Sequence, residues 1–517
     1  MPRPRVGLLR VVLCGALVLS AAPAAAQVSG SSLLEAQNGN RPFNPFDPQP
    51  RNRIDLYDQL NLTYDLTQGR IGARFEINEN SQDQNAYQVF TQRWAEWMDE
   101  GYKVRVGNFH TLLGRGLIHR SFELPGVVLD DIGLRSRFGP SRDVDGLFVE
   151  GSKGPVSGRL FGGRPTGGER SPAHDELGED RYFGQLAGGQ AAVTPRRDLM
   201  VGAAYLRSSN PAGESEFGSG FVEFDPLAGF HPVSLPFYVE YAQQDGSLGE
   251  WFEFRNGEDV PHALYAGANL LWSTFALSAE WKDYRDFRLG TNDPPSLVKE
   301  HPWTLLNRNT HVLNATDEEG FQIETSWGHR LGSVTVNRSR ADGVFGRQSR
   351  RFEETYVEAH VSPFGPWTWE GTLFYDRGRD GFQFITDRDI WGGSVTVVPL
   401  PDISLTIDFQ TQCATRVGDV DFNDQFLSCA LARAGWGSAA VVWERSTDPA
   451  QEKIDDFAEP GIQARYFLAG VISGRLTGRH EATLFFGERR GGPACTAGTC
   501  YEVQPFVGVE LRLVSRF

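Results

Sequence analysis

Apolar and polar residues alternate with a period of two along much of this chain. From Ile54 to Leu66 the even-numbered positions are predominantly apolar and the odd-numbered positions predominantly polar. Successive side chains of a β-strand point to opposite faces, so this alternation predicts a strand with one apolar and one polar face. The same pattern recurs at 71–77, 354–361 and 403–410, and no comparable stretch shows helical spacing. The chain is therefore expected to consist mainly of amphipathic β-strands.

The connections between these strands alternate between tight and long. Tight turns are predicted at 67–70, 99–102 and 195–198, and long polar loops at stretches such as 119–144 and 341–351. Short turns at one end and long loops at the other are typical of up-and-down barrels of the outer membrane. Two strands per tight turn, with an allowance for unrecognised turns, predict an all-β transmembrane antiparallel barrel of about 20 to 24 strands.

The N-terminus has the layout of a secretory signal peptide. Arg3, Arg5 and Arg10 precede an apolar run, and the small residues that follow end at Ala26. The apolar run is shorter than the ~20 residues that a membrane-spanning helix needs, which disfavours a retained anchor. We therefore divide the chain into a cleaved signal peptide (1–26), an N-terminal segment with a first strand (27–52) and a barrel with long loops (53–517).

Composition and charge narrow the class of protein further. The 58 Gly and 29 Pro residues would interrupt helices throughout the chain, which disfavours a helical bundle. The 35 Phe, 14 Tyr and 12 Trp residues suit the interfacial girdles of a barrel. Without the three arginines of the signal peptide, 47 basic residues remain against 66 acidic residues, a net charge of −19. A nucleic-acid partner is therefore not expected.

The C-terminus carries a further amphipathic strand. Val507, Val509, Leu511 and Leu513 alternate with polar residues, and the chain ends in Phe517. This ending resembles the sorting signal that the barrel-assembly machinery reads in outer-membrane proteins, although Ser515 stands where an apolar or aromatic residue is usual. We expect that machinery to be a partner during biogenesis.

Four cysteines follow the signal peptide, and they form two pairs that are close in sequence. Cys413 is near Cys429, and Cys495 is near Cys500. Because no histidine lies near either pair and an exported protein favours disulfides, we predict two disulfides and no metal site.

One segment combines a strand with a glycine-rich, basic continuation. Residues 107–117 read GNFHTLLGRGL, a GNF-x(4)-GRGL pattern, and are preceded by the FTQR stretch at 90–93. These motifs resemble an uncharacterised family of porin-like outer-membrane barrels, and the resemblance covers about the first third of the mature chain. The resemblance implies an outer-membrane barrel and names no substrate.

The continuation of this segment carries charges of both signs. Between Arg115 and Asp145 there are five arginines and five acidic residues. An inward-folded loop with opposed charges can narrow a channel and orient polar solutes, so we interpret this segment as a constriction with Arg115 and Arg120 on its basic side. A solvated external loop is the alternative. The predicted constriction residues are Arg115, Arg120, Arg135, Arg137, Asp130 and Asp131.

Function is expected to reside in the lumen of such a barrel. Barrels with ~16 or more strands leave an aqueous channel, so we favour a channel in the cell outer membrane for passive diffusion of small polar or charged solutes. Outer-membrane lipid and lipopolysaccharide are expected to surround it. The alternative is a non-conducting scaffold, surface receptor or secretion-accessory barrel. The sequence has no Walker loop, G-x-G-x-x-G or H-E-x-x-H motif, so we expect no cofactor and no enzymatic activity.

Overall fold

The computed structural model describes most of the chain after the predicted signal peptide. The described residues are 28–41, 51–81, 85–131, 134, 136–168, 170–176, 182, 184–210, 213–230, 232–245, 260–287, 289–295, 298–309, 317–345, 348–362, 368–449, 464–496 and 499–517. Residues 1–26 and Arg135 lie outside them. The structure therefore bears neither on the predicted cleavage nor on the role of Arg135.

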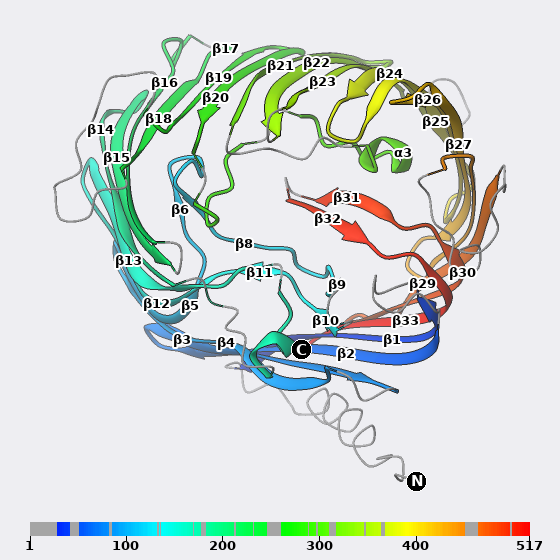
Figure 1. Cartoon of the computed structure of the whole chain (residues 1–517), viewed down its shortest axis with the longest axis horizontal. Coiled ribbons are helices and arrows are strands. Elements are labelled where there is room, and N and C mark those ends of the chain that lie inside the picture. The colour runs from blue at the N-terminus through cyan, green and yellow to red at the C-terminus, as the bar shows by residue number, and fades with distance from the viewer. Residues whose placement is uncertain are drawn as a thin grey trace, which may run out of the picture.

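Within the described residues, 24 long antiparallel strands form the wall of a barrel (Figure 1). Each wall strand pairs with the next wall strand along the chain, as expected for an up-and-down barrel. The wall strands are β1 (Val28–Arg41), β2 (Arg51–Leu66), β3 (Gly69–Asn80), β4 (Tyr87–Asp99), β5 (Tyr102–Phe109), β12 (Val144–Lys153), β13 (Val156–Pro165), β14 (Gln185–Arg196), β15 (Leu199–Asn210), β16 (Gly213–Phe224), β18 (Phe237–Asp245), β19 (His262–Trp272), β20 (Phe275–Arg285), β21 (Asp317–His329), β22 (Gly332–Phe345), β23 (Gln348–Val361), β24 (Trp369–Asp380), β25 (Ile385–Leu400), β26 (Ile403–Arg416), β27 (Val420–Arg433), β28 (Gly437–Ser446), β29 (Arg465–Thr477), β30 (His480–Arg489) and β33 (Phe506–Arg516).

The barrel is closed by pairing of its first and last strands. β1 pairs with β33 from Ser31 opposite Arg516 to Asn40 opposite Val507. The terminal Phe517 continues this pairing, because Gly30 and Phe517 exchange two backbone hydrogen bonds of 2.8 and 3.0 Å. Closure leaves no unpaired strand edge, which a membrane-spanning sheet requires. The predicted fold class, an all-β antiparallel barrel of the outer-membrane type, is confirmed.

The alternation in sequence corresponds to the two faces of the wall. On β2, Ile54 is 57% exposed on the outer face, whereas Tyr57, three positions further along on the inner face, is fully buried. Exposed aromatic residues lie on the outer face at two levels: Trp97, Trp272 and Trp327 near the turn-side ends of their strands, and Tyr205, Tyr375 and Trp391 farther toward the loop side. An apolar outer band between aromatic girdles is the surface that a barrel presents to a lipid bilayer.

The two ends of the barrel differ in their connections. At one end, here called the turn side, the predicted tight turns at 67–70, 99–102 and 195–198 join β2 to β3, β4 to β5 and β14 to β15. The opposite end is the loop side, and not all of its connections are long. The prediction of a long loop at 341–351 is wrong, because β22 and β23 extend into it from both sides and pair up to Phe345 opposite Gln348. Asp342, Arg350 and Arg351 of this stretch belong to these strands.

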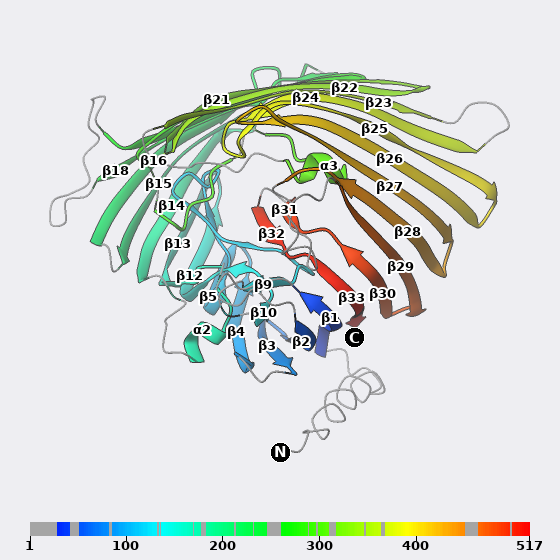
Figure 2. The same cartoon turned by 45° about the vertical axis from the view of Figure 1, so that its right-hand side comes forward.

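Three loop-side connections enter the ring of strands (Figures 1 and 2). The first, residues 110–143, contains the short strands β6 (Leu112–Leu113), β7 (His119–Arg120), β8 (Phe122–Glu123), β9 (Leu129–Asp131), β10 (Ser136–Phe138) and β11 (Ser141–Arg142). The second follows β20 and contains the helical turn α3 (Thr304–Asn307), and the third is the hairpin of β31 (Gly492–Thr496) and β32 (Thr499–Val503). The remaining short elements are α2 (Ala173–Glu176) and β17 (Val233–Ser234). No helix among the described residues has the length and apolarity to cross a membrane.

Only one of the two predicted disulfides forms. Cys495 and Cys500 are bonded to each other across the β31–β32 hairpin. Cys413 and Cys429 are free, so the prediction of a disulfide between them is wrong. They lie on neighbouring strands, but Cys413 pairs with Asn423 and Cys429 pairs with Ile407. This offset of six residues along β26 separates them by about 20 Å, far more than a disulfide spans.

Candidate lumenal constriction

Residues 110–143, here called the lumenal strap, cross the inside of the barrel. At one end the backbone N–H of Arg115 donates to the carboxylate of Glu240 on β18, at 2.7 Å. Further along, the carbonyl of Gly126 accepts a hydrogen bond from the guanidinium of Arg512 on β33. β18 lies eleven wall strands from β33 in one direction and thirteen in the other. The strap therefore connects nearly opposite parts of the wall, as Figure 2 also shows.

Glycines in the GRG motif allow the strap to turn against the wall. Gly114 and Gly116 have positive φ values of 54° and 96°, which favour glycine. A Cβ atom on Gly114 would lie 2.1 Å from the Glu240 carboxylate. The Gly114 N–H also donates to Gln190 of β14, at 2.8 Å. The motif thus lets the backbone approach two polar wall residues closely.

Apolar residues anchor the first part of the strap. Leu113, Leu117 and Ile118 are fully buried in a cluster that includes Phe148 and Phe161 of the wall. His119 follows them and packs on Phe161, with ring centroids 5.2 Å apart. Burial, with a contribution from the nearby Arg142 cation, lowers the pKa of His119 to about 3. His119 is therefore neutral in the docked strap at physiological pH.

The later part of the strap is held by buried ion pairs. The guanidinium of Arg137 contacts Glu35 of β1, and its Nε lies 3.3 Å from the carboxylate of Asp130. Arg137 is 2% exposed. Asp131 contacts His174 of α2 at 2.8 Å and accepts a hydrogen bond from the Leu134 N–H at 3.1 Å. These three predicted constriction residues contact protein groups that fix the strap in place.

Arg115 and Arg120 have more solvent-accessible positions. The Arg115 side chain is exposed, and its guanidinium lies over the ring of Tyr238 at 4.7 Å from the centroid. Arg120 is half-buried and forms an ion pair of 3.0 Å with Asp293, from the connection after β20. Burial raises the pKa of Asp293, and the nearby Arg120 opposes this shift. Of the five predicted constriction residues that the structure describes, these two remain the candidates for contact with a solute.

The acidic groups around Arg115 come from the wall. Glu240, which accepts the Arg115 N–H, is fully buried and serves as an anchor. Glu280 of β20 is half-buried and interacts electrostatically with Arg115. Further half-buried carboxylates face inward on the strands beyond β20, namely Glu324, Glu358 and Asp408. Together with Glu280 they form what we call the carboxylate arc.

Sequence reasoning missed the carboxylate arc because it looked for acids near Arg115 along the chain. Glu280 is on a wall strand far away in sequence and approaches Arg115 only when the barrel closes. A signal was present in the sequence, because Glu280 stands between the apolar residues Ala279 and Trp281. Without the register of the sheet, nothing indicated that the strap would face this strand.

The segment containing α3 lines the wall on the side of β21 to β28. The Lys299 ammonium lies 2.5 Å from Glu324 of β21. Trp303 stacks on Phe374 with centroids 4.3 Å apart, and its indole N–H donates to the hydroxyl of Tyr356 at 2.8 Å. Arg308 forms an ion pair with Glu444 of β28 through both terminal nitrogens of its guanidinium. The segment is thus fixed to the wall by both apolar and charged contacts.

The three inserted segments also contact one another. The strap joins the α3 segment through the Arg120 to Asp293 ion pair and through a backbone hydrogen bond from Arg120 to Thr291 at 3.1 Å. The side chain of Asn307 accepts from the N–H of Cys495 at 2.9 Å and donates to its carbonyl at 3.3 Å. The strap, the α3 segment and the disulfide-bonded hairpin therefore form one connected assembly inside the barrel.

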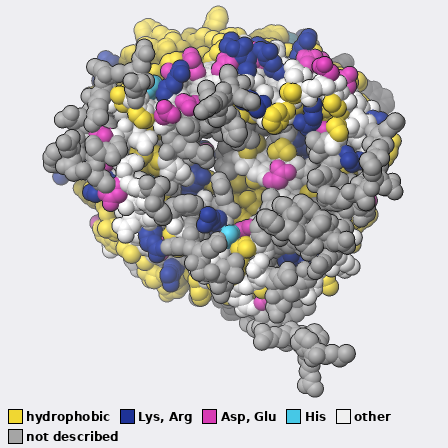
Figure 3. All heavy atoms as spheres, viewed as in Figure 1, with side chains coloured by type: hydrophobic (Ala, Val, Ile, Leu, Met, Phe, Trp, Pro, Cys, Tyr) yellow, Lys and Arg dark blue, Asp and Glu magenta, His cyan; other side chains and the backbone are white. Residues whose placement is uncertain are grey.

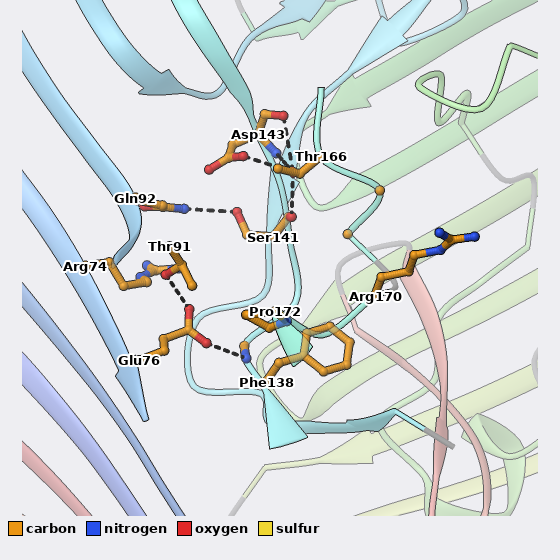
Figure 4. Close-up of a pocket in the computed structure, with 13 residues that line it drawn as sticks. Arg74, Glu76, Thr91, Gln92, Phe138, Ser141, Asp143, Thr166, Arg170 and Pro172 are labelled. Atoms are coloured by element: carbon orange, nitrogen blue, oxygen red, sulfur yellow. Dashed lines mark hydrogen bonds between the residues drawn. The ribbon is translucent and has the colours of Figure 1, made fainter. Parts of the chain in front are cut away.

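Cavities of different sizes lie next to the strap. A cavity of about 570 Å³ separates it from β30, β33 and β1 to β3, and Arg74, Glu123, Glu481, Arg512 and Arg516 are among its lining residues. A second one, of only about 20 Å³, lies between β3, β4 and the returning strap (Figure 4). There Thr91 donates to Glu76 and Gln92 to Ser141, at 2.7 and 3.1 Å. This volume suffices for about one water molecule, so of these two cavities the larger one has room for a solute.

The described residues contain no group of three His, Cys, Asp or Glu side chains that could hold a metal ion.

Comparisons with known proteins find solved structures of low similarity. No protein-family model and no curated protein matches the chain. Among solved structures, OccK5 (OpdH) of Pseudomonas aeruginosa is similar over 71% of this chain and 96% of its own, with 13% identity and a TM-score of 0.42. The P pilus usher (PapC) translocation pore is similar over 95% of this chain and 99% of its own, with 10% identity and a TM-score of 0.47. OccAB3 of Acinetobacter baumannii is similar over 69% of this chain and 94% of its own, with 10% identity and a TM-score of 0.41. These low scores and identities do not bear on function.

Proposed function

We propose that this protein is a porin-like channel of the cell outer membrane for passive diffusion of small polar or charged solutes. The observation that carries the proposal is the strap, which crosses the lumen and presents Arg115 near Glu280 of β20, two wall strands from its anchor on β18. A ring of 24 strands encloses far more space than its own inward side chains fill. A charged segment across such a lumen narrows it and selects what passes.

Opposed charges give this narrowing its selectivity. Arg115 and Arg120 stand on the strap, and the carboxylate arc lies on the wall, so a transverse field acts on a solute between them. The arc consists of Glu280, Glu324, Glu358 and Asp408, and the basic groups beside it include Arg115 and Lys299. Because carboxylates are in excess along this wall, we expect a preference for cations.

The proposal includes a cellular setting. The apolar outer band with aromatic girdles supports insertion in a lipid bilayer, in which lipopolysaccharide forms the outer leaflet. Export through a signal peptide cleaved after Ala26 and insertion by the barrel-assembly machinery are parts of the same proposal. Small polar solutes are the expected cargo, without a cofactor.

Planar-bilayer recording of the purified protein tests the proposal. We expect stepwise conductance with a reversal potential that indicates cation preference. Replacing two arc residues, E280Q with E324Q, should reduce that preference, whereas E214Q on the outer face of β16 should leave it unchanged. A correctly folded barrel that gives no conductance steps would contradict the channel proposal.

The connected assembly in the lumen also suits a second function. Because the strap, the α3 segment and the hairpin hold one another, a non-conducting scaffold, surface receptor or secretion-accessory barrel would show the same contacts. Such a protein would be electrically silent in the same recording. The bilayer experiment therefore separates the two functions.

A further inference from the structure

Four arginines form a group on the outer face of the barrel at its loop side. Arg338 and Arg340 are on β22, Arg351 is on β23 and Arg379 is on β24. Their side chains are 45%, 38%, 43% and 44% exposed. Figure 3 shows dark-blue side chains gathered on the rim over β22 and β23, with magenta side chains beside them. We call these residues, with their two carboxylate partners below, the arginine lattice.

Two carboxylates hold the four guanidinium groups. Glu353 lies 3.0 Å from Arg379 and 3.6 Å from Arg338, and Asp342 lies 2.6 Å from Arg340 and also contacts Arg351. A further contact of 3.8 Å links Arg351 to Glu353. Four positive charges around two negative charges leave a net charge of +2 on the lattice. Elsewhere on the outer face, Arg207 of β15 pairs with the single carboxylate Glu214 at 3.1 Å.

The lattice stands directly above the apolar band on the same strands. Toward the turn side, the outer face of β22, β23 and β24 carries Val336, Val357 and Leu373, which are 42%, 36% and 65% exposed. Tyr375, 44% exposed, lies between Leu373 and the charged end of β24. Aromatic residues mark the boundary between hydrocarbon and headgroups in membrane barrels. The guanidinium groups are therefore placed at the depth of the lipid headgroups.

We propose that the arginine lattice is a binding site for the phosphate groups of a membrane lipid. Each guanidinium has five N–H donors in a planar fork, and phosphate oxygens match this fork in a bidentate manner. Glu353 and Asp342 occupy only part of these donors and hold the side chains in position. The apolar band beneath the lattice contacts the acyl chains of the same lipid, which a free anion lacks. This site rests on the proposed placement of the barrel in a membrane.

The site also accounts for the course of the chain at 341–351. Long β-strands carry the lattice beyond the apolar band, and the connection between β22 and β23 is correspondingly short. On β22 and β23 the outward-facing residues change from valine to arginine and acidic residues at the loop-side limit of the apolar band. The inward-facing residues Asn337 and Ser339 of β22 remain buried. The charged residues are thus presented on the outer face by a rigid sheet.

Native mass spectrometry of the full-length barrel in detergent tests the site. The probes are lipid A with its phosphates and the same lipid after enzymatic dephosphorylation, each with and without excess inorganic phosphate. We expect the wild-type protein to retain the phosphorylated lipid and R338Q with R379Q to bind it at least about tenfold more weakly. The charge-preserving pair R338K with R379K should recover part of the affinity, and R207Q should bind as the wild type does.

Three outcomes would overturn the site. Equal retention of both lipids, or unchanged binding by the R338Q and R379Q variant, would remove the phosphate contact. Displacement of the lipid by inorganic phosphate at a comparable concentration would mean that a free anion is the ligand. Heat-modifiable mobility on gels shows that each variant is a folded barrel. Native mass spectrometry does not depend on conductance. A barrel that binds the lipid but gives no conductance would therefore contradict the proposed channel and leave the lipid site in place.

Discussion

Glu35 on β1 and Arg137 on the lumenal strap form an ion pair from which solvent is nearly excluded, with side-chain exposures of 4% and 3%. The two residues are 102 positions apart in the sequence. Breaking a buried ion pair by removing one partner leaves an uncompensated charge. This pair therefore holds the returning part of the strap to the wall near the barrel seam.

We expect E35Q to weaken docking of the strap by about 3–5 kcal/mol, because Arg137 would remain buried with Asp130 as its nearest carboxylate. Limited proteolysis of the folded barrel should then cut within 110–143 much faster than in the wild type. D198N is the control, since Asp198 belongs to the exposed pair with Arg196 and its loss should cost less than about 1 kcal/mol. Equal resistance of E35Q and wild type would contradict the anchoring role.

Acid should weaken docking of the strap through His119. Its pKa is about 3 in the docked strap and 6.5 in its ordinary state, so the undocked strap binds a proton first as pH falls. Docking is unaffected above pH 6.5 and weakens below it by about 1.4 kcal/mol per pH unit, until the docked histidine also protonates near pH 3. Hydrogen exchange of residues 110–143 should accelerate over this range, and H119F should show a flatter dependence. If the hydrogen-exchange rates of H119F and the wild type depended on pH in the same way, protonation of His119 would not be the cause of the weakening.

A single methyl group at Gly114 should displace the strap. Its φ of 54° is unfavourable for alanine, and the new Cβ would lie 2.1 Å from the Glu240 carboxylate. We expect G114A to lower stability against urea by about 1–3 kcal/mol. G220A is the matched control, because a Cβ at Gly220 meets no atom within 4 Å. If both variants unfold at the same urea concentration, the close approach of Gly114 to Glu240 does not contribute to stability.

Thiol counting distinguishes the two cysteine pairs. Alkylation of the unfolded, unreduced protein should modify Cys413 and Cys429 and leave Cys495 and Cys500 unmodified until a reductant is added. Mass spectrometry of the peptides gives the answer directly. A cross-linked peptide joining Cys413 to Cys429 would show that the strand register of β26 and β27 differs from the one described.

The wall of the barrel was predictable from sequence, because lipid and water impose opposite requirements on neighbouring residues of each strand. Ile54 and Tyr57 already indicate the two faces of β2 before any register is known. The sequence pattern also misled at one place, since the charged stretch at 341–351 indicated a long loop, whereas residues 341–345 belong to β22 and 348–351 to β23. The strands there continue past the apolar band, where the requirement for apolar side chains ends.

The arrangement inside the lumen was not predictable, because it depends on pairs that are distant in sequence. Arg115 meets Glu240 across 125 positions, and Arg137 meets Glu35 across 102. Composition located a mixed-charge segment but could not separate charges that anchor, such as Arg137, from charges that remain accessible, such as Arg115. That distinction follows only from burial and from the partners that the closed barrel provides.

Replacing the strap by a short linker tests most directly whether it narrows a channel. β5 and β12 pair with each other from Phe109 opposite Val144 downward, so a flexible Gly-Ser linker in place of 112–141 leaves the wall complete. With folding verified by heat-modifiable mobility, single-channel recording should show conductance steps several-fold larger than those of the wild type and a weaker ion preference. Steps of unchanged size and selectivity would contradict the account.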